Sequence, residues 1–256
     1  MNWKPDFSPR KSDPAASPEP VAPQTAPVKR ETQTADILPY VVPMFIYVTL
    51  AGAEGYLPQL GSQPNPAWYA VAYIARLGIV AALAFRYRET WKDFRPLPRS
   101  PGLVLAVATG LLVAFLWVGL DRYYPRFGVM GKRTSFDPSA MEAVPRVLFY
   151  IFRMTGLVIL VPVIEELFWR SFLNRWLIEP DFRRVPIGRV TWMSAAVTSA
   201  LFATAHPEWL PALITGALWA WLLHQTKSLG ACLISHAVAN LALGIYVIQF
   251  RAWEFW

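Results

Sequence analysis

The chain is divided into long, nearly uncharged apolar blocks, and this pattern limits its fold more than any other feature. A helix of about 20 apolar residues spans the hydrocarbon core of a bilayer and satisfies its backbone hydrogen bonds internally. The sequence therefore predicts an all-α, polytopic helical membrane protein with about 7–8 transmembrane helices. The blocks cover residues 37–57, 67–85, 102–120, 145–169, 190–206, 209–224 and 229–249.

Residues 1–36 differ from the rest of the chain, because they contain seven prolines among alanine, serine, threonine and lysine. Such a segment cannot bury enough apolar surface to offset the entropy lost on ordering it. We therefore expect a disordered, proline-rich cytoplasmic tail over 1–36, followed by a helical transmembrane domain over 37–256. No apolar stretch follows the first charges, so we do not expect a signal peptide.

The net charge of the chain is +7, but lysine and arginine lie mainly in the connections between apolar blocks. This distribution indicates membrane topology and contact with the lipid bilayer, and it argues against nucleic acid as a partner. Basic residues in the tail and after the second and fourth blocks predict a cytoplasmic N-terminus by the positive-inside rule. The basic loop 121–144 disagrees with that orientation.

Two adjacent carboxylates and an arginine interrupt the fourth block in the stretch VIEELFWR, residues 163–170. Ionisable side chains inside an apolar helix cost about 2.5–3.5 kcal/mol each on insertion scales, so they need a structural or functional reason. Glu166 and Arg170 are four residues apart and can pair along one helix face. Glu165 points about 100° away without that partner, which suits a general base. Pro162 removes a backbone donor nearby and could let water in.

Later blocks carry further polar side chains. His206 follows Phe202 by four residues, and His236 and Asn240 share one face of the last block. For His206 the structural alternative is a side chain that snorkels to the interface beside Trp209. For His236 and Asn240 it is a pair of hydrogen bonds between helices, because polar side chains join helices in membranes. Pairing or snorkelling to the interface is the expected role of the four remaining polar residues in or near the blocks, Glu54, Arg76, Arg153 and His224.

Taken together, these groups form an ordered set of three motifs: Glu-Glu-x-x-x-Arg at 165–170, Phe-x-x-x-His at 202–206 and His-x-x-x-Asn at 236–240. The set resembles the CPBP family of intramembrane proteases, which includes the CAAX-prenyl endopeptidases and bacterial abortive-infection proteins. The resemblance covers residues 145–249. The stretch VPVIEELFWRSFL also looks like the CAAX-protease-related subgroup associated with exosortase systems.

This resemblance implies an intramembrane endopeptidase, a hydrolase that cuts a membrane-anchored or lipid-modified protein in the bacterial inner membrane. In the first implied role, Glu165 would activate a water molecule, with His206 assisting or orienting that water. In the second, His236 and Asn240 would donate hydrogen bonds to the oxyanion formed on the scissile carbonyl. Peptide hydrolysis needs such a base and such donors, and a cavity between helices would supply both.

The resemblance also implies that Glu166 and Arg170 brace the site. Relatives have been described as metalloproteases as well, and Glu165, His206 and His236 could in principle hold a divalent metal such as zinc. The chain has no His-Glu-x-x-His motif, and further ligands are not evident. The sequence therefore favours a metal-free mechanism over a zinc mechanism.

Two other classes of function stay open. The chain could be a non-catalytic membrane scaffold or regulator that keeps the polar cluster for folding. It could also be a solute or proton-coupled transporter, because buried Glu and His are typical of transporters. The transporter class is disfavoured by the lack of paired broken helices in matching halves.

In the expected topology Glu165 lies near the cytoplasmic end of its block. His206 lies at the opposite end of block 190–206, far from the level of Glu165. For the motifs to meet, this block must start deeper in the membrane, tilt strongly or break before His206. We therefore expect the end of the stretch VTWMSAAVTSALFATAH to lie near the middle of the membrane.

Overall fold

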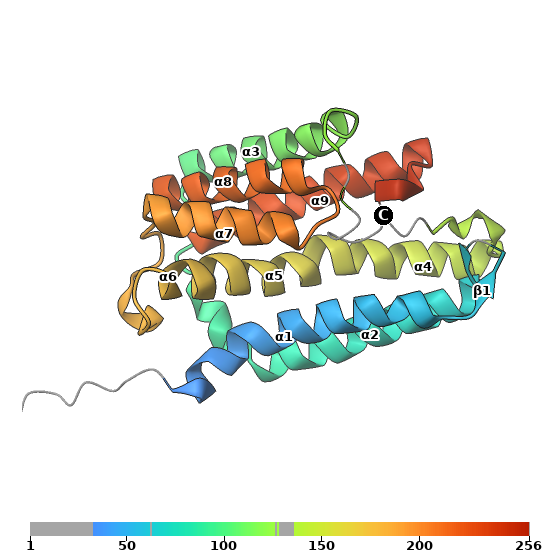
Figure 1. The fold of residues 1–256 in the computed structure, drawn as a ribbon, viewed down its shortest axis with the longest axis horizontal. Coiled ribbons are helices and arrows are strands. Elements are labelled where there is room, and N and C mark those ends of the chain that lie inside the picture. Colours follow the sequence, from blue (N-terminus) through green and yellow to red (C-terminus); the bar gives the residue numbers. More distant parts are fainter. Residues whose placement is uncertain (1–32, 62, 126, 128–135, 256) are drawn as a thin grey trace, which may run out of the picture. The chain divides into compact units, whose positions relative to one another are not determined.

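Helices account for most of the protein, and the all-α prediction is confirmed (Figure 1). Within the described part of the chain, the strands are a short antiparallel pair, β1 (Gln59–Leu60) and β2 (Gln63–Pro64). The first helix begins at Thr34, so the expected tail over 1–36 lies almost entirely outside the described residues. The computed structural model describes residues 33–61, 63–125, 127 and 136–255.

The elements have the following bounds. The longer α-helices are α1 (Thr34–Ala53), α2 (Pro66–Arg86), α3 (Ser100–Gly119), α4 (Ala143–Thr155), α7 (Trp192–Thr204), α8 (Trp209–Thr226) and α9 (Leu229–Phe250). Shorter α-helical pieces are α5 (Val161–Glu166) and α6 (Asn174–Trp176), and π-helical segments cover Gly156–Leu160 and Leu167–Leu173. Segments of 3₁₀ helix lie at Glu54–Tyr56, Arg88–Phe94, Pro138–Ala140, Phe182–Arg184 and Trp253–Phe255.

Among the described residues, five helical segments are long and apolar enough to cross a membrane, which makes this an integral membrane protein. They correspond to five of the seven predicted blocks. The other two blocks are helical as well, with 18 residues in α8 and 13 in α7. At about 1.5 Å per residue, α7 is only about 20 Å long, shorter than a hydrocarbon core of about 30 Å. The five segments are Thr34–Tyr56, Pro66–Arg86, Ser100–Gly119, Ala143–Trp176 and Leu229–Phe250.

One helical run extends from Ala143 to Trp176 and contains the fourth predicted block. Its hydrogen bonding changes within Gly156–Leu160, where the N–H of Val161 donates to the carbonyl five residues earlier. In that register the carbonyl of Leu157 faces position 162, which is a proline without an N–H. The run stays helical through this point, but the Leu157 carbonyl must find its donor on another helix.

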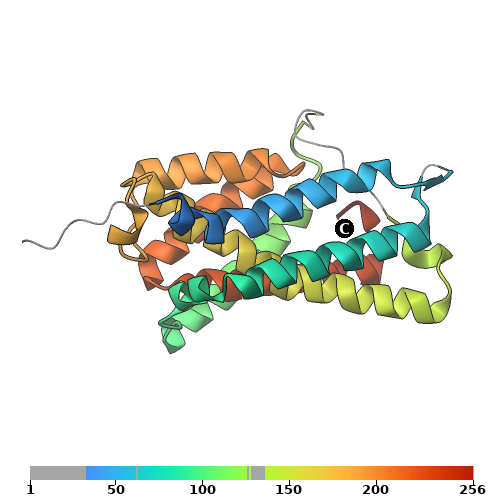
Figure 2. The ribbon, with the colours of Figure 1, turned by 90° about the horizontal axis from the view of Figure 1, so that it is seen from below.

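The long α4–α6 run lies between two groups of helices. In Figure 1, helices α3, α7, α8 and α9 lie on one side of it, and α1 and α2 lie on the other. Figure 2 shows the α1–α2 pair in front of the remaining helices. Within these groups α3 packs against α9, α7 against α8, and α1 against α2. The apolar core that joins the groups contains Met44, Trp169, Phe202 and Trp219.

Two glycines permit close contacts with the backbone of a neighbouring helix. A Cβ on Gly110 of α3 would lie 2.4 Å from the carbonyl oxygen of Ser235 in α9. A Cβ on Gly216 of α8 would lie 2.8 Å from the Cα of Ser199 in α7. Because Ser235 directly precedes His236, the α3–α9 contact also fixes the backbone that carries one of the predicted site residues.

Four polar residues outside the three motifs contact other side chains within the protein: Glu54, Arg76, Arg153 and His224. Arg76 Nη1 lies 3.0 Å from Glu54 Oε1, and the Arg76 side chain is 4 % exposed. The guanidinium groups of Arg76 and Arg153 lie 4.8 Å and 4.7 Å from the ring centre of Tyr73. His224 Nδ1 lies 3.4 Å from the ammonium nitrogen of the lysine three residues later. Pairing, one of the two roles expected for these residues, therefore accounts for Glu54 and Arg76.

Gly110→Ala is expected to lower the free energy of unfolding by about 1–3 kcal/mol, because the added methyl group meets backbone that cannot move away. Gly78→Ala is the matched control, since a Cβ there meets nothing within 4 Å. Denaturant titration of both variants in detergent micelles measures the difference. Equal stability of Gly110→Ala and wild-type protein would contradict the close packing of α3 on α9.

Candidate active site

A cavity of about 330 Å³ lies among α1, α3, the long helix, the α7–α8 turn and α9. All four residues predicted to be catalytic line it, although they come from three separate motifs: Glu165, His206, His236 and Asn240. Apolar side chains such as Met44 and Val113 form much of the remaining wall. The structure therefore brings the predicted residues together in one pocket between helices.

Glu165 faces this cavity and is 6 % exposed. Its Oε2 atom is buried, and among the described residues it has no hydrogen-bond partner. A buried carboxylate without a partner is destabilising unless it is protonated or solvated. The arrangement fits a group that acts on water or on a ligand in the cavity.

Glu166 points away from the cavity and is fully buried. Its Oε1 accepts hydrogen bonds from Arg170 Nη1 at 3.3 Å and from His236 Nδ1 at 2.8 Å. The Arg170 guanidinium lies over the rings of Phe202 and Trp219, at 4.7 Å and 4.8 Å from their centres. The predicted Glu166–Arg170 pair is therefore present. The bond to His236 was not predicted, because 70 residues separate the two positions.

The tautomer of His236 follows from this contact. A carboxylate only accepts, so Nδ1 carries the proton and Nε2 is the remaining ring nitrogen. The imidazole is stacked on Trp219, with ring centres 4.3 Å apart, and only 4 % of the residue is exposed. In the neutral form Nε2 accepts a hydrogen bond, whereas in the imidazolium form it donates one. The predicted donation to an oxyanion thus requires the doubly protonated ring.

Asn240 supplies the donor that the long helix lacks. Its Nδ2 donates to the carbonyl of Leu157 at 2.8 Å, which is the carbonyl that faces Pro162 in the π register. An amide NH₂ group has two hydrogens, so one remains for a ligand in the cavity. Asn240 therefore links α9 to the irregular part of the long helix and lines the site at the same time.

His206 lies in the turn after α7, because that helix ends at Thr204. Of the three arrangements that would let the motifs meet, the structure therefore has the helix break before His206. Figure 1 shows that α7 ends partway along the long α4–α6 run. The carbonyl of Phe202 accepts from His206 Nδ1 at 2.8 Å, so Nε2 keeps a lone pair. Trp117 holds the ring edge-on at 5.6 Å.

The cavity also contains residues that the motifs did not predict. The side chain of Glu208 lines the cavity and is 7 % exposed, and its position two residues after His206 was the available signal. Trp219 forms the floor beneath His236, and its Nε1 donates to Ser235 Oγ at 3.0 Å. An aromatic residue in an apolar helix gives no sequence signal for such a role.

A metal site does not fit the described residues well. Zinc in proteins takes three or four His, Cys, Asp or Glu ligands at about 2.0–2.3 Å. In the part of the chain that the structure describes, no group of three such side chains is arranged to hold a metal ion. Glu165, His206 and His236 line the same cavity, but they do not converge on one point.

The fold and the site define a polytopic helical membrane protein with a cavity between its helices that is lined by Glu165, His206, His236 and Asn240. Residues 147–242 match the sequence profile of the family described as Type II CAAX prenyl endopeptidase Rce1-like, which is a family of proteases. The matched segment contains all three motifs, and α1 to α3 lie outside it. No curated protein and no solved structure matches the chain. The resemblance to CAAX-prenyl endopeptidases is thus confirmed at the level of the family.

Arg170→Ala is expected to lower the free energy of unfolding by about 3–5 kcal/mol, because Glu166 is left as a buried charge with one fewer partner. The double variant Glu166→Gln/Arg170→Met should recover much of this loss, since glutamine still accepts from His236 while the charge is gone. Thermal unfolding in detergent measures both. A double variant less stable than Arg170→Ala would contradict this account of the pair.

Proposed function

We propose that the protein is an intramembrane endopeptidase in which Glu165 activates water to hydrolyse a peptide bond of a membrane-associated protein. The family match supports the general class of activity. The observation that carries the proposal is the buried Oε2 atom of Glu165, which has no hydrogen-bond partner among the described residues and shares a cavity with His206, His236 and Asn240. The dielectric constant there is low, so fixed donors act more strongly on developing charge than they would in water.

In the proposed reaction, Glu165 takes a proton from a water molecule whose second hydrogen is held by the His206 Nε2 lone pair. The water oxygen then attacks the carbonyl carbon of the scissile peptide, and the carbonyl π electrons move to its oxygen. The free hydrogen of the Asn240 amide and Nε2–H of the His236 imidazolium donate to that oxyanion. Collapse of the tetrahedral intermediate breaks the C–N bond, and the proton on Glu165 passes to the leaving amine.

The proposed substrate is a membrane-anchored or lipid-modified protein, since the cavity lies between helices that themselves cross the bilayer. We further propose that the protein resides in a bacterial inner membrane with its N-terminus in the cytoplasm, as the basic connections indicate. Membership of the exosortase-associated subgroup, suggested by VPVIEELFWRSFL, also belongs to this proposal.

A second candidate function is that of a non-catalytic membrane scaffold. The bonds of Glu166 to both Arg170 and His236 favour it, because such a network stabilises the helix bundle without any chemistry. The two functions differ in what they require of Glu165, which takes no part in that network. A scaffold tolerates the loss of the Glu165 carboxylate, whereas a peptidase does not.

Glu165→Gln is expected to lower the rate of cleavage by about 100-fold to 10,000-fold, the usual contribution of a general base. Glu89→Gln, the same change at an exposed carboxylate, should leave cleavage unchanged. Proteomic mapping of membrane-protein termini in cells that express each variant measures the difference. New termini that appear equally with Glu165→Gln and wild-type protein would rule out the glutamate mechanism.

Treatment of the purified protein with a chelator, followed by gel filtration, is expected to leave cleavage within about twofold of the untreated rate if no metal takes part. Metal analysis of the same sample accompanies the assay. Loss of cleavage that zinc restores would instead indicate a metalloprotease, with Glu165, His206 and His236 as its first ligands to examine.

A further inference from the structure

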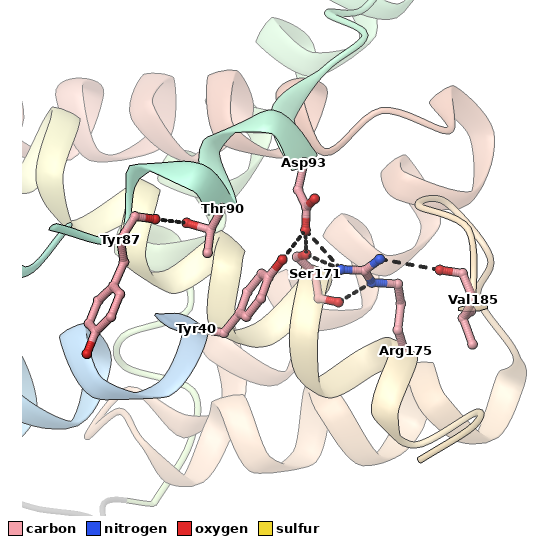
Figure 3. Close-up of polar contacts among 7 residues, drawn as sticks. All are labelled: Tyr40, Tyr87, Thr90, Asp93, Ser171, Arg175 and Val185. Atoms are coloured by element: carbon pink, nitrogen blue, oxygen red, sulfur yellow. Dashed lines mark hydrogen bonds and ion pairs between the residues drawn. The ribbon is translucent and has the colours of Figure 1, made fainter. Parts of the chain in front are cut away.

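A single carboxylate oxygen outside the cavity joins three parts of the protein. Asp93 lies in the 3₁₀ segment Arg88–Phe94, which follows α2. Its Oδ2 accepts hydrogen bonds from Tyr40 at 2.9 Å, from Ser171 at 2.5 Å and from Arg175 at 2.9 Å (Figure 3). These donors come from α1 and from the end of the long helical run. The segment after α2 therefore holds both of these helices at one point.

The group is well shielded and electrically balanced. The side chains of Arg175 and Asp93 are 7 % and 12 % exposed, and Ser171 is fully buried. Arg175 extends the group, because its Nη2 also donates to Ser171 Oγ at 2.7 Å and its Nη1 donates to the carbonyl of Val185 at 3.3 Å. A paired, largely buried carboxylate that accepts several hydrogen bonds makes a rigid and directional contact.

Two partners of Asp93, Ser171 and Tyr40, lie on helices that also line the cavity. Ser171 directly follows Arg170, so its position fixes the rotation of the helix that carries Glu165 and Glu166. Tyr40 lies one helical turn before Met44, and Met44 and Tyr47 form part of the cavity wall on α1. Asp93 thus joins the helix of Glu165 to the α1 wall by hydrogen bonds, in addition to the direct packing of Tyr40 on Phe172.

The geometry points to Asp93 as a positioning residue that holds the α1 wall of the cavity in register with the helix of Glu165. This inference rests on the proposed peptidase function for its kinetic consequence. The α1 wall contacts the bound substrate, whereas the rotation of the long helix sets the angle at which Glu165 meets water. Loss of the bond from Tyr40 should therefore affect substrate binding, and loss of the bond from Ser171 should affect the chemical step.

Variants that each remove one hydroxyl group test the two contacts of Asp93 separately. Tyr40→Phe removes only the hydroxyl group, and the ring keeps its contacts with Phe172 and Phe182, whose centres lie 6.3 Å and 5.2 Å away. Ser171→Ala removes the hydroxyl group that donates to Asp93 and accepts from Arg175, and it leaves the bond from Arg175 to Asp93 in place. Thr90→Val is the matched control, because Thr90 bonds to the carbonyl of Tyr87 in the same segment without reaching Asp93 (Figure 3).

The kinetic test uses a quenched fluorescent peptide built on the strongest Glu165-dependent cleavage site found in the membrane proteome. Tyr40→Phe is expected to raise KM about tenfold with kcat within about twofold, since the wall binds substrate and transition state alike. Ser171→Ala is expected to lower kcat by about 10-fold to 100-fold with little change in KM, because a shift of about 1 Å at the reacting atoms costs that much. Asp93→Asn should show both effects.

Unchanged kcat and KM in all three variants, with only a lower melting temperature, would overturn the positioning role and leave a purely structural contact. Spin labels at the exposed positions Leu38 and Trp176, in a Cys232→Ala background, supply a readout that needs no substrate. The distance distribution between them should broaden in Asp93→Asn and remain unchanged in Thr90→Val. Absence of any Glu165-dependent cleavage would count against the proposed function, while an unbroadened distribution in Asp93→Asn would count against this inference.

Discussion

The arrangement of the site depends on the hydrogen bonds that the buried carboxylate of Glu166 accepts. A charge in a medium of low dielectric constant is stable only when it is paired and hydrogen-bonded. Glu166 meets this requirement with Arg170 on its own helix and His236 on α9. Arg170 in turn lies over Phe202 of α7 and Trp219 of α8. The long helix, α7, α8 and α9 therefore meet around the Glu166–Arg170 pair.

Helix geometry gives the two adjacent glutamates opposite roles. Successive residues point about 100° apart, so Glu166 faces the interior of the bundle while Glu165 faces the cavity. The network of Glu166 stabilises the helix, and this stability holds Glu165 in a position that is unfavourable for a carboxylate. This division would let a single dipeptide serve both the folding of the bundle and the proposed chemistry.

The sequence predicted those features that depend on local spacing. Four-residue spacing identified the Glu166–Arg170 pair, and apolar length identified the membrane helices. Spacing could not predict the His236–Glu166 bond, because it depends on how α9 packs against a helix 70 positions earlier. It could not predict the Asn240–Leu157 bond either, since a regular helix has no free carbonyl at that point. Asp93 lies in the connection after the second apolar block. The charges of that connection indicated the topology, but no spacing predicted a role for Asp93.

The short length of α7 has a consequence for water in the protein. A helix of about 20 Å that starts at one face of the hydrocarbon core ends inside that core. Its end, the turn from Ala205 to Glu208, is irregular backbone, and such backbone at membrane depth is tolerated where it is buried in protein or lines a hydrated cavity. Within this turn the N–H groups of Ala205 and His206 donate to the carbonyls of Phe202 and Ala203, and the turn lines the cavity. Water in the cavity would solvate the backbone groups that remain, and the same water would supply the nucleophile of the proposed reaction.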